Sequence, residues 1–447
     1  MVVPTQIKIR NSKIANNPYI CKEKFQSLMD SQVLDKLKIL AESAKYDVSC
    51  SSSGTVRNNK KGGLGNTVGG VGICHSFADD GRCISLLKVM LTNYCIFDCA
   101  YCINRHSNDI RRATLAVSEL VEITMEFYRR NYIEGLFLSS GVVRNADYTM
   151  ERLVKVAKDL RAQGFNGYIH LKSIPGASQL LVNEAGLYAD RMSINVEIPK
   201  EQSLKLLAPE KDFKSIFTPM KFIGQGLLES KENRQKFRNA PRFVPAGQST
   251  QMIVGVSPET DNDILHLSSA LYSQPSMRRV YYSGYVSVNE YDKRLPALKQ
   301  PPLVRENRLY QADWLLRFYQ FKVDEIVDDS FPNLDLEVDP KLSWALRHPE
   351  IFPMDVNTAP YEMILRIPGI GTRSAAQIVA SRRYGKLNSF HLKKIGVVMK
   401  KAQYFIVNKE LPMHTINELK PETVKKLLTA NPKKDKMEGQ LTFEFGG

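Results

Sequence analysis

The 447-residue sequence lacks any apolar run near the roughly 18 residues that a membrane span needs. Its first residues, MVVPTQIKIRNSKI, lack the apolar stretch of a secretory signal. It has seven cysteines, and none follows Cys102. A disulfide scaffold would spread its cysteines along the chain and would need an oxidising compartment. We therefore expect a cytoplasmic protein that has no membrane partner and uses its bunched cysteines for metal binding or catalysis.

What is present is ordinary for a globular protein, except for the charge. Apolar residues make up 43% and charged residues 24%, and the length predicts two to three domains. The net charge is +15, which favours polyanionic partners, although a lysine-rich proteome would give the same surplus. Residues 351–447 hold 16 Lys and Arg against 8 Asp and Glu, so over half of the surplus lies in about a fifth of the chain.

The distribution of apolar residues predicts an α/β fold. In residues 1–82, a helical stretch at Lys22–Lys45 precedes a Gly/Ser-rich loop at 49–72, which contains no Gly-Lys-Ser/Thr phosphate loop. In residues 83–290, short buried-type strands alternate with helices, which indicates parallel βαβ units. Six such strands predict a partial (β/α)6 barrel. In such folds the reactive groups lie at the carboxyl ends of the strands.

The remaining third of the chain differs in character. Residues 291–350 are predicted to be a connecting segment with an amphipathic helix at QADWLLRFYQF. Residues 351–420 are predicted to form a small all-α domain, and residues 421–447 a flexible tail.

Three cysteines, Cys95-x3-Cys99-x2-Cys102, follow the first predicted strand of the barrel, CISLLKVML. An iron–sulfur cube normally takes four thiolate ligands, so three would leave one iron open to a small ligand. A zinc site is the alternative, but it expects a second cysteine pair at suitable spacing. Cys74 and Cys83, with eight residues between them, do not supply that pair.

The loop LTNYCIFDCAYCINR resembles the signature of the radical S-adenosylmethionine (SAM) superfamily, including the aromatic Tyr101 before the last cysteine. The resemblance implies a [4Fe–4S] cluster on Cys95, Cys99 and Cys102, whose open iron binds SAM. An electron from a donor such as flavodoxin or ferredoxin would then cleave SAM to a 5′-deoxyadenosyl radical, which abstracts a hydrogen from the substrate. No catalytic residue beyond the cluster ligands is assigned.

The same resemblance implies further cofactor-binding positions. A turn after the second barrel strand would meet the SAM amino group; this chain has Ser139, Ser140 and Gly141 there, without the family's usual acidic residue. The polar positions of RMSINVEIP and a glycine after the fifth barrel strand would meet the ribose, carboxylate and adenine of SAM. With Tyr101, these predicted contacts are Ser193, Asn195, Glu197 and Gly255. Ordinary solvation of strand ends is the alternative for the polar side chains.

The segment MILRIPGIGTRSAAQIVASRR is predicted to form two helices around Pro368–Gly371. It resembles a helix-hairpin-helix motif, in which backbone N–H groups at a helix start bind phosphate without reading bases. SFHLKKIGVVMKKAQYFI resembles a degenerate second copy. The predicted nucleic-acid contacts are Gly369, Gly371, Arg373, Lys393 and Lys394. A small helical packing domain is the alternative.

The barrel and hairpin together resemble a family of radical SAM proteins named for DNA modification or repair. The resemblance covers most of the chain, including YDVSCSSSG, GICHSF, NYIEGLFLSSG and NRLYQADWLLRFY. It implies a DNA partner. Two alternatives stay open: the same chemistry on RNA such as tRNA, and a DNA-binding protein whose iron–sulfur cluster is structural.

Overall fold

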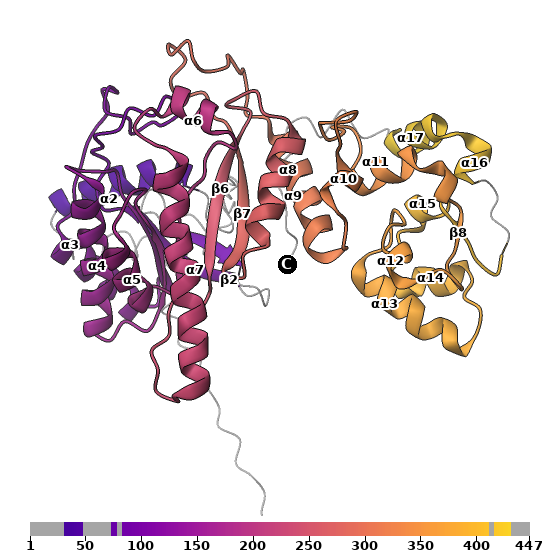
Figure 1. Ribbon diagram of the computed structural model, residues 1–447, viewed down its shortest axis with the longest axis horizontal. Coiled ribbons are helices and arrows are strands. Elements are labelled where there is room, and N and C mark those ends of the chain that lie inside the picture. The colour runs from indigo at the N-terminus through magenta and orange to yellow at the C-terminus, as the bar shows by residue number, and fades with distance from the viewer. Residues whose placement is uncertain (1–30, 48–72, 78–82, 411–414, 431–447) are drawn as a thin grey trace, which may run out of the picture. The chain divides into compact units, whose positions relative to one another are not determined.

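The computed structural model describes residues 31–47, 73–77, 83–410 and 415–430. The Gly/Ser-rich loop predicted at 49–72, the start of the predicted helix Lys22–Lys45 and residues 431–447 lie outside this part. Seven strands form one sheet in sequence order (Figure 1). They are β1 (Ile73–Phe77), β2 (Cys83–Met90), β3 (Gly135–Ser139), β4 (Tyr168–Lys172), β5 (Arg191–Ser193), β6 (Gln248–Val254) and β7 (Met277–Gly284).

The sheet matches the predicted α/β class. β2 pairs in parallel with β3, β3 with β4, and β6 with β7. β1 is an additional strand that sequence reasoning missed, and it pairs antiparallel with β2 at the edge. Its sequence, ICHSF, has two adjacent polar residues and therefore gives no continuous apolar run.

The chain divides into two compact units. The first comprises residues up to 97, 104–192 and 239–245, and the second comprises 98–103, 193–238 and 246 onward. The helices of the first unit are α2 (Ser31–Ser43), α3 (Val117–Arg129), α4 (Ala146–Ala162) and α5 (Gln179–Tyr188). Asn145 caps α4 by accepting the Tyr148 N–H at 2.8 Å, and Gly164 follows its end at φ +82°. These helices occupy the positions that the apolar periodicity predicted.

The second unit contains the remaining helices. Those before residue 350 are α6 (Glu201–Leu207), α7 (Phe213–Lys236), α8 (Asp261–Tyr272), α9 (Leu303–Phe318), α10 (Val323–Ile326) and α11 (Pro340–Arg347). Those after it are α12 (Tyr361–Ile364), α13 (Thr372–Ser381), α14 (Ser389–Ile395), α15 (Met399–Ala402), α16 (Ile416–Leu419) and α17 (Pro421–Thr429). No helix among the described residues combines the length and apolar character of a membrane span.

Two features of the C-terminal region differ from the prediction. The domain predicted to be all-α contains a two-stranded parallel sheet, in which β8 (Met354–Asp355) pairs with β9 (Ile406–Val407). Strands of two residues are too short to give an alternating pattern. The start of the predicted tail is helix α17, because Val424 is buried and Lys425 pairs with Asp335 at 2.7 Å.

The fourth barrel strand, β5, is shorter than predicted. RMSINVEIP was predicted to be a strand throughout, but β5 ends at Ser193. Beyond it, Glu197 has φ +66° and bridges β6: its N–H donates to Gln251 O, and its carbonyl accepts the Ile253 N–H, both at 2.8 Å. A left-handed backbone at a non-glycine residue breaks the regular pleat, so the extended run stops there.

Candidate functional site

The loop that follows β2 is tied down at both ends within the first unit. The Asn93 side chain accepts the Ala113 N–H at 2.8 Å and donates to Arg111 O at 2.9 Å. The Arg112 guanidinium donates to four carbonyls at 2.5–2.9 Å, those of Asn93, Asn104, Arg105 and Asn108. One guanidinium that donates to four carbonyl oxygens holds the backbone of the loop in a single conformation.

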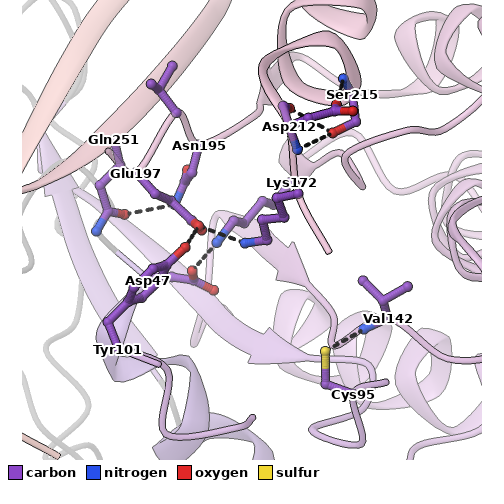
Figure 2. A network of polar contacts seen from close by, with 12 residues as sticks. Asp47, Cys95, Tyr101, Val142, Lys172, Asn195, Glu197, Asp212, Ser215 and Gln251 are labelled. Atoms are coloured by element: carbon purple, nitrogen blue, oxygen red, sulfur yellow. Dashed lines mark hydrogen bonds and ion pairs between the residues drawn. The ribbon is translucent and has the colours of Figure 1, made fainter. Parts of the chain in front are cut away.

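The Ser139–Gly141 turn after β3 lies directly against this loop. The Gly141 N–H donates to Thr92 O at 2.8 Å, and Val142 N–H donates to the Cys95 sulfur at 3.4 Å (Figure 2). A Cβ on Gly141 would come 2.2 Å from the carbonyl oxygen of Tyr94 and 3.2 Å from the Cβ of Cys95. The role of Gly141 is therefore to let the two backbones approach beside the first cysteine. Ser140 turns its hydroxyl to the Gly141 carbonyl at 2.7 Å.

Gly141→Ala is expected to displace Cys95 and lower the iron bound per chain after reconstitution, because the backbone of Tyr94 must move to admit the Cβ. Iron content and circular dichroism would be measured on the same sample. Ser140→Ala is the matched control, since it removes a hydroxyl and adds no atom. Unchanged iron in the glycine variant would show that the close approach does not position Cys95.

The second half of the cysteine loop is held within the second unit. The Ala100 N–H donates to Leu207 O at 2.7 Å, and the Asp98 N–H donates to the Glu210 carboxylate at 3.1 Å. The buried Asn289 amide donates to Ala100 O at 2.6 Å and to Cys102 O at 3.1 Å. Segments more than 100 residues away in sequence therefore fix the backbone that carries Cys99 and Cys102.

Tyr101, Glu197 and Lys211 form a buried polar network in this unit (Figure 2 labels the first two). The Glu197 carboxylate accepts from the Tyr101 hydroxyl and pairs with the Lys211 ammonium at 2.6 Å. Burial, followed by the charge of Glu197, raises the pKa of Tyr101 well above its ordinary value, so the phenol stays protonated and donates. Burial lowers the pKa of Lys211, but the nearby Cys99 and Glu197 outweigh it, and the net pKa is raised. Lys211 is therefore a permanent cation near the Cys99 and Cys102 thiols.

The other predicted SAM contacts in the second unit are Ser193, Asn195 and Gly255. Asn195 donates to the Gln251 side chain at 3.3 Å, and Ser193 ends β5 as a buried side chain. Gly255 follows β6 at φ +83°, and a Cβ there would come 3.0 Å from Pro302. The structure thus joins Tyr101 to Glu197 and Asn195 to Gln251.

A second buried polar group lies on one face of the sheet in the first unit, and sequence reasoning missed most of it. The register places Lys88, Phe137 and His170 side by side on β2, β3 and β4. Lys172 pairs with the Asp47 carboxylate, and Lys88 donates to the Asp47 carbonyl (Figure 2 shows the first pair). Burial, followed by Arg191, lowers the pKa of His170 well below its ordinary value, so its imidazole is neutral. Burial raises the pKa of Asp47, but Lys172 outweighs it, and the net pKa is lowered.

The hairpin glycines have different structural roles. Gly369, at φ +86°, packs so closely that a Cβ would come 2.6 Å from Val398 O, and its own carbonyl accepts the Val398 N–H at 2.9 Å. It lets the turn before α13 pack against the start of α15. Gly371 is the N-cap of α13. Arg373 is exposed in the first turn of α13, and Lys393 and Lys394 are exposed in the last turn of α14.

The donor set on the cysteine loop fits an iron–sulfur cluster. None of Cys95, Cys99 and Cys102 is in a disulfide bond, and the Val142 N–H donates to the Cys95 sulfur. Among the described residues, no three His, Cys, Asp or Glu side chains are gathered as ligands of a single metal ion. The fit rests on three thiols from one loop, the donors that such clusters require.

Comparison with known families assigns this region. Residues 89–271 match the family model "Radical SAM superfamily". They form a radical SAM domain. Enzymes of this superfamily use a [4Fe–4S] cluster and SAM, which confirms the predicted cofactors at the level of the domain. No curated protein sequence matches the chain at a significant level.

Three solved structures resemble part of this chain weakly. The [FeFe]-hydrogenase maturase HydG is 15% identical, with a TM-score of 0.39 over 51% of this chain and 48% of that one. Methylornithine synthase PylB is 14% identical, also with a TM-score of 0.39, over 51% of this chain and 60% of that one. Coproporphyrinogen III oxidase from Escherichia coli is 12% identical at 0.30, over 50% of each chain. The matches thus span less than two thirds of these proteins, and the assignment rests on the family match.

The radical SAM domain contains the cysteine triad and every predicted SAM contact, from Tyr101 to Gly255. The hairpin residues Gly369 to Lys394 lie outside the matched residues 89–271.

Proposed function

We propose that the chain is a radical SAM enzyme that acts on DNA, by modification or repair. The radical SAM part of this proposal rests on one observation: the loop after β2 carries three cysteines outside any disulfide, and it lies inside the residues that match the superfamily. When bound there, the cluster supplies the electron that cleaves SAM. The protein's own part is to hold the three thiols, and to keep Lys211 charged and Tyr101 protonated beside Cys99 and Cys102.

The proposal of a nucleic-acid substrate is supported by the C-terminal region. Residues 351–447 carry 16 Lys and Arg against 8 Asp and Glu. Arg373, Lys393 and Lys394 are exposed. Contacts from such cations to phosphates supply affinity without sequence preference, which suits an enzyme that must bind many sites. DNA rather than RNA is the reading favoured by the family resemblance of the sequence.

Anaerobic incubation with SAM, dithionite and either DNA or RNA tests the reaction. We expect 5′-deoxyadenosine to form, and mass spectrometry of the digested nucleosides to show a change in the DNA sample. A product confined to RNA would replace the proposal by its RNA alternative. If SAM leaves the electron paramagnetic resonance spectrum of the reduced protein unchanged, the cluster is structural.

A full-length variant in which Arg373, Lys393 and Lys394 are all replaced by Glu is expected to bind DNA more weakly than the wild-type protein. The log–log dependence of affinity on salt should become shallower by about 0.9 for each phosphate that the variant no longer binds. The matched control reverses Lys231, Arg234 and Lys236, three exposed cations of α7. Binding would be measured by fluorescence anisotropy at several salt concentrations. If both variants lose the same affinity, the hairpin is not a specific DNA-binding site and serves only in packing.

A further inference from the structure

Helix α9 exposes two large aromatic side chains next to each other. Trp314 and Phe318 are 49% and 44% exposed, and their ring centroids lie 4.4 Å apart at 48°. The Arg317 guanidinium lies 4.8 Å from the centroid of the Phe318 ring. Residues four apart share one face of a helix, so the two rings form a continuous apolar surface with a cation at its side.

Tyr319 borders both this surface and the hairpin. Tyr319 directly follows Phe318 and ends α9. A Cβ on Gly371, the N-cap of α13, would lie 3.6 Å from the Tyr319 hydroxyl oxygen. The phenol next to Phe318 in sequence therefore lies beside the start of the helix in which phosphate contacts are proposed.

The start of α13 keeps donors and a cation beside that phenol. The first hydrogen bond within the helix runs from Ala375 N–H to Gly371 O at 2.8 Å, so the N–H groups of Arg373 and Ser374 precede it. The side chain of Arg373 is exposed. Lys341 donates to Ile370 O at 2.5 Å in the turn, but burial lowers its pKa to about 7, so it is not a fixed cation. The exposed cation at the start of α13 is therefore Arg373.

We propose that Trp314 and Phe318 stack an unpaired base of a DNA strand, whose neighbouring phosphate lies at the start of α13. This rests on the proposed function and narrows its substrate to DNA with at least one unstacked base. Every base has a π-face that an exposed aromatic ring can stack, whereas a base within a duplex cannot reach such a surface. The exposed Arg373 complements the strand's phosphates and would disfavour a basic partner protein, whereas the charge of Arg317 is paired with Asp313 at 3.5 Å.

The chain offers a direct probe, because it has only two tryptophans. Trp314 is 49% exposed, whereas Trp344 is 3% exposed and packs against Phe321 and Phe352. The difference in fluorescence between the wild-type protein and Trp314→Phe therefore reports Trp314 alone. We expect a single-stranded oligothymidylate to quench the fluorescence of Trp314 that this difference reports. An abasic strand of equal length, which has the same phosphates, should bind without quenching.

Affinity provides the second measurement. Trp314→Ala should weaken binding of the oligothymidylate roughly 5- to 100-fold and leave binding of the abasic strand unchanged. Phe237→Ala, which removes a ring that is 65% exposed at the end of α7, is the matched control and should change neither. Binding of the oligothymidylate without quenching, and with the same affinity in Trp314→Ala, would overturn the stacking surface and leave the proposed function standing. Quenching by RNA alone would overturn the choice of DNA, and no binding of any strand would remove the nucleic-acid function as well.

Discussion

Cys99→Ala is expected to abolish reductive SAM cleavage and to remove most of the roughly four irons that a [4Fe–4S] protein binds per chain. Cys99 is one of three thiols on one loop, and it is 5% exposed. With two thiols left, a cube would lose a second fixed ligand. The fold should survive, because the Asn289 and Leu207 contacts that hold this part of the loop use backbone groups of its neighbours.

Cys74→Ala is the matched control, since it makes the same substitution on β1, outside the triad. It should keep its iron and the change in the electron paramagnetic resonance spectrum on addition of SAM. Iron and 5′-deoxyadenosine would be measured on both variants, reconstituted side by side. Full SAM cleavage by Cys99→Ala would falsify the assignment of the triad, and loss of about half the iron in Cys74→Ala would reveal a second cluster.

The cysteine site could be predicted because its signal is local in sequence. Three thiols within eight residues, placed after an apolar strand, specify both the ligand and its position at a strand end. The strands β2, β3, β4, β6 and β7 were predictable for a similar reason, since each is a short apolar run between helices.

The residues that surround the site could not be predicted in this way. Lys211 lies between two helices in a segment without a motif, and only the folded chain brings it to Glu197. Asn289 supports Ala100 and Cys102 from nearly 190 residues away in sequence. Lys88 is a single polar residue in an apolar strand, and its partners are the Phe137 ring on β3 and the Asp47 carbonyl. Contacts of this kind depend on the register of the sheet and on which distant segments the fold brings together. The periodicity of apolar residues in the sequence does not encode either.

The buried Glu197–Lys211 pair leads to the second large effect. The two side chains are 12% and 11% exposed, and they meet at 2.6 Å. Desolvating two charges can consume most of their attraction, so the pair by itself adds little to the free energy of unfolding. Removing one partner is different, because the other charge then stays buried without compensation.

Glu197→Gln keeps the size of the side chain and an oxygen that can accept from Tyr101, but it leaves the Lys211 ammonium without its anion. We expect the free energy of unfolding of the cluster-free protein to fall by about 3–5 kcal/mol, measured by urea denaturation. The double variant Glu197→Gln/Lys211→Met should recover much of this loss, since it removes the uncompensated charge. Glu184→Gln, at the exposed pair with Lys158, is the control and should change the stability far less. If the double variant is as unstable as Glu197→Gln alone, the loss does not come from the uncompensated Lys211 ammonium, and the explanation by charge burial is wrong.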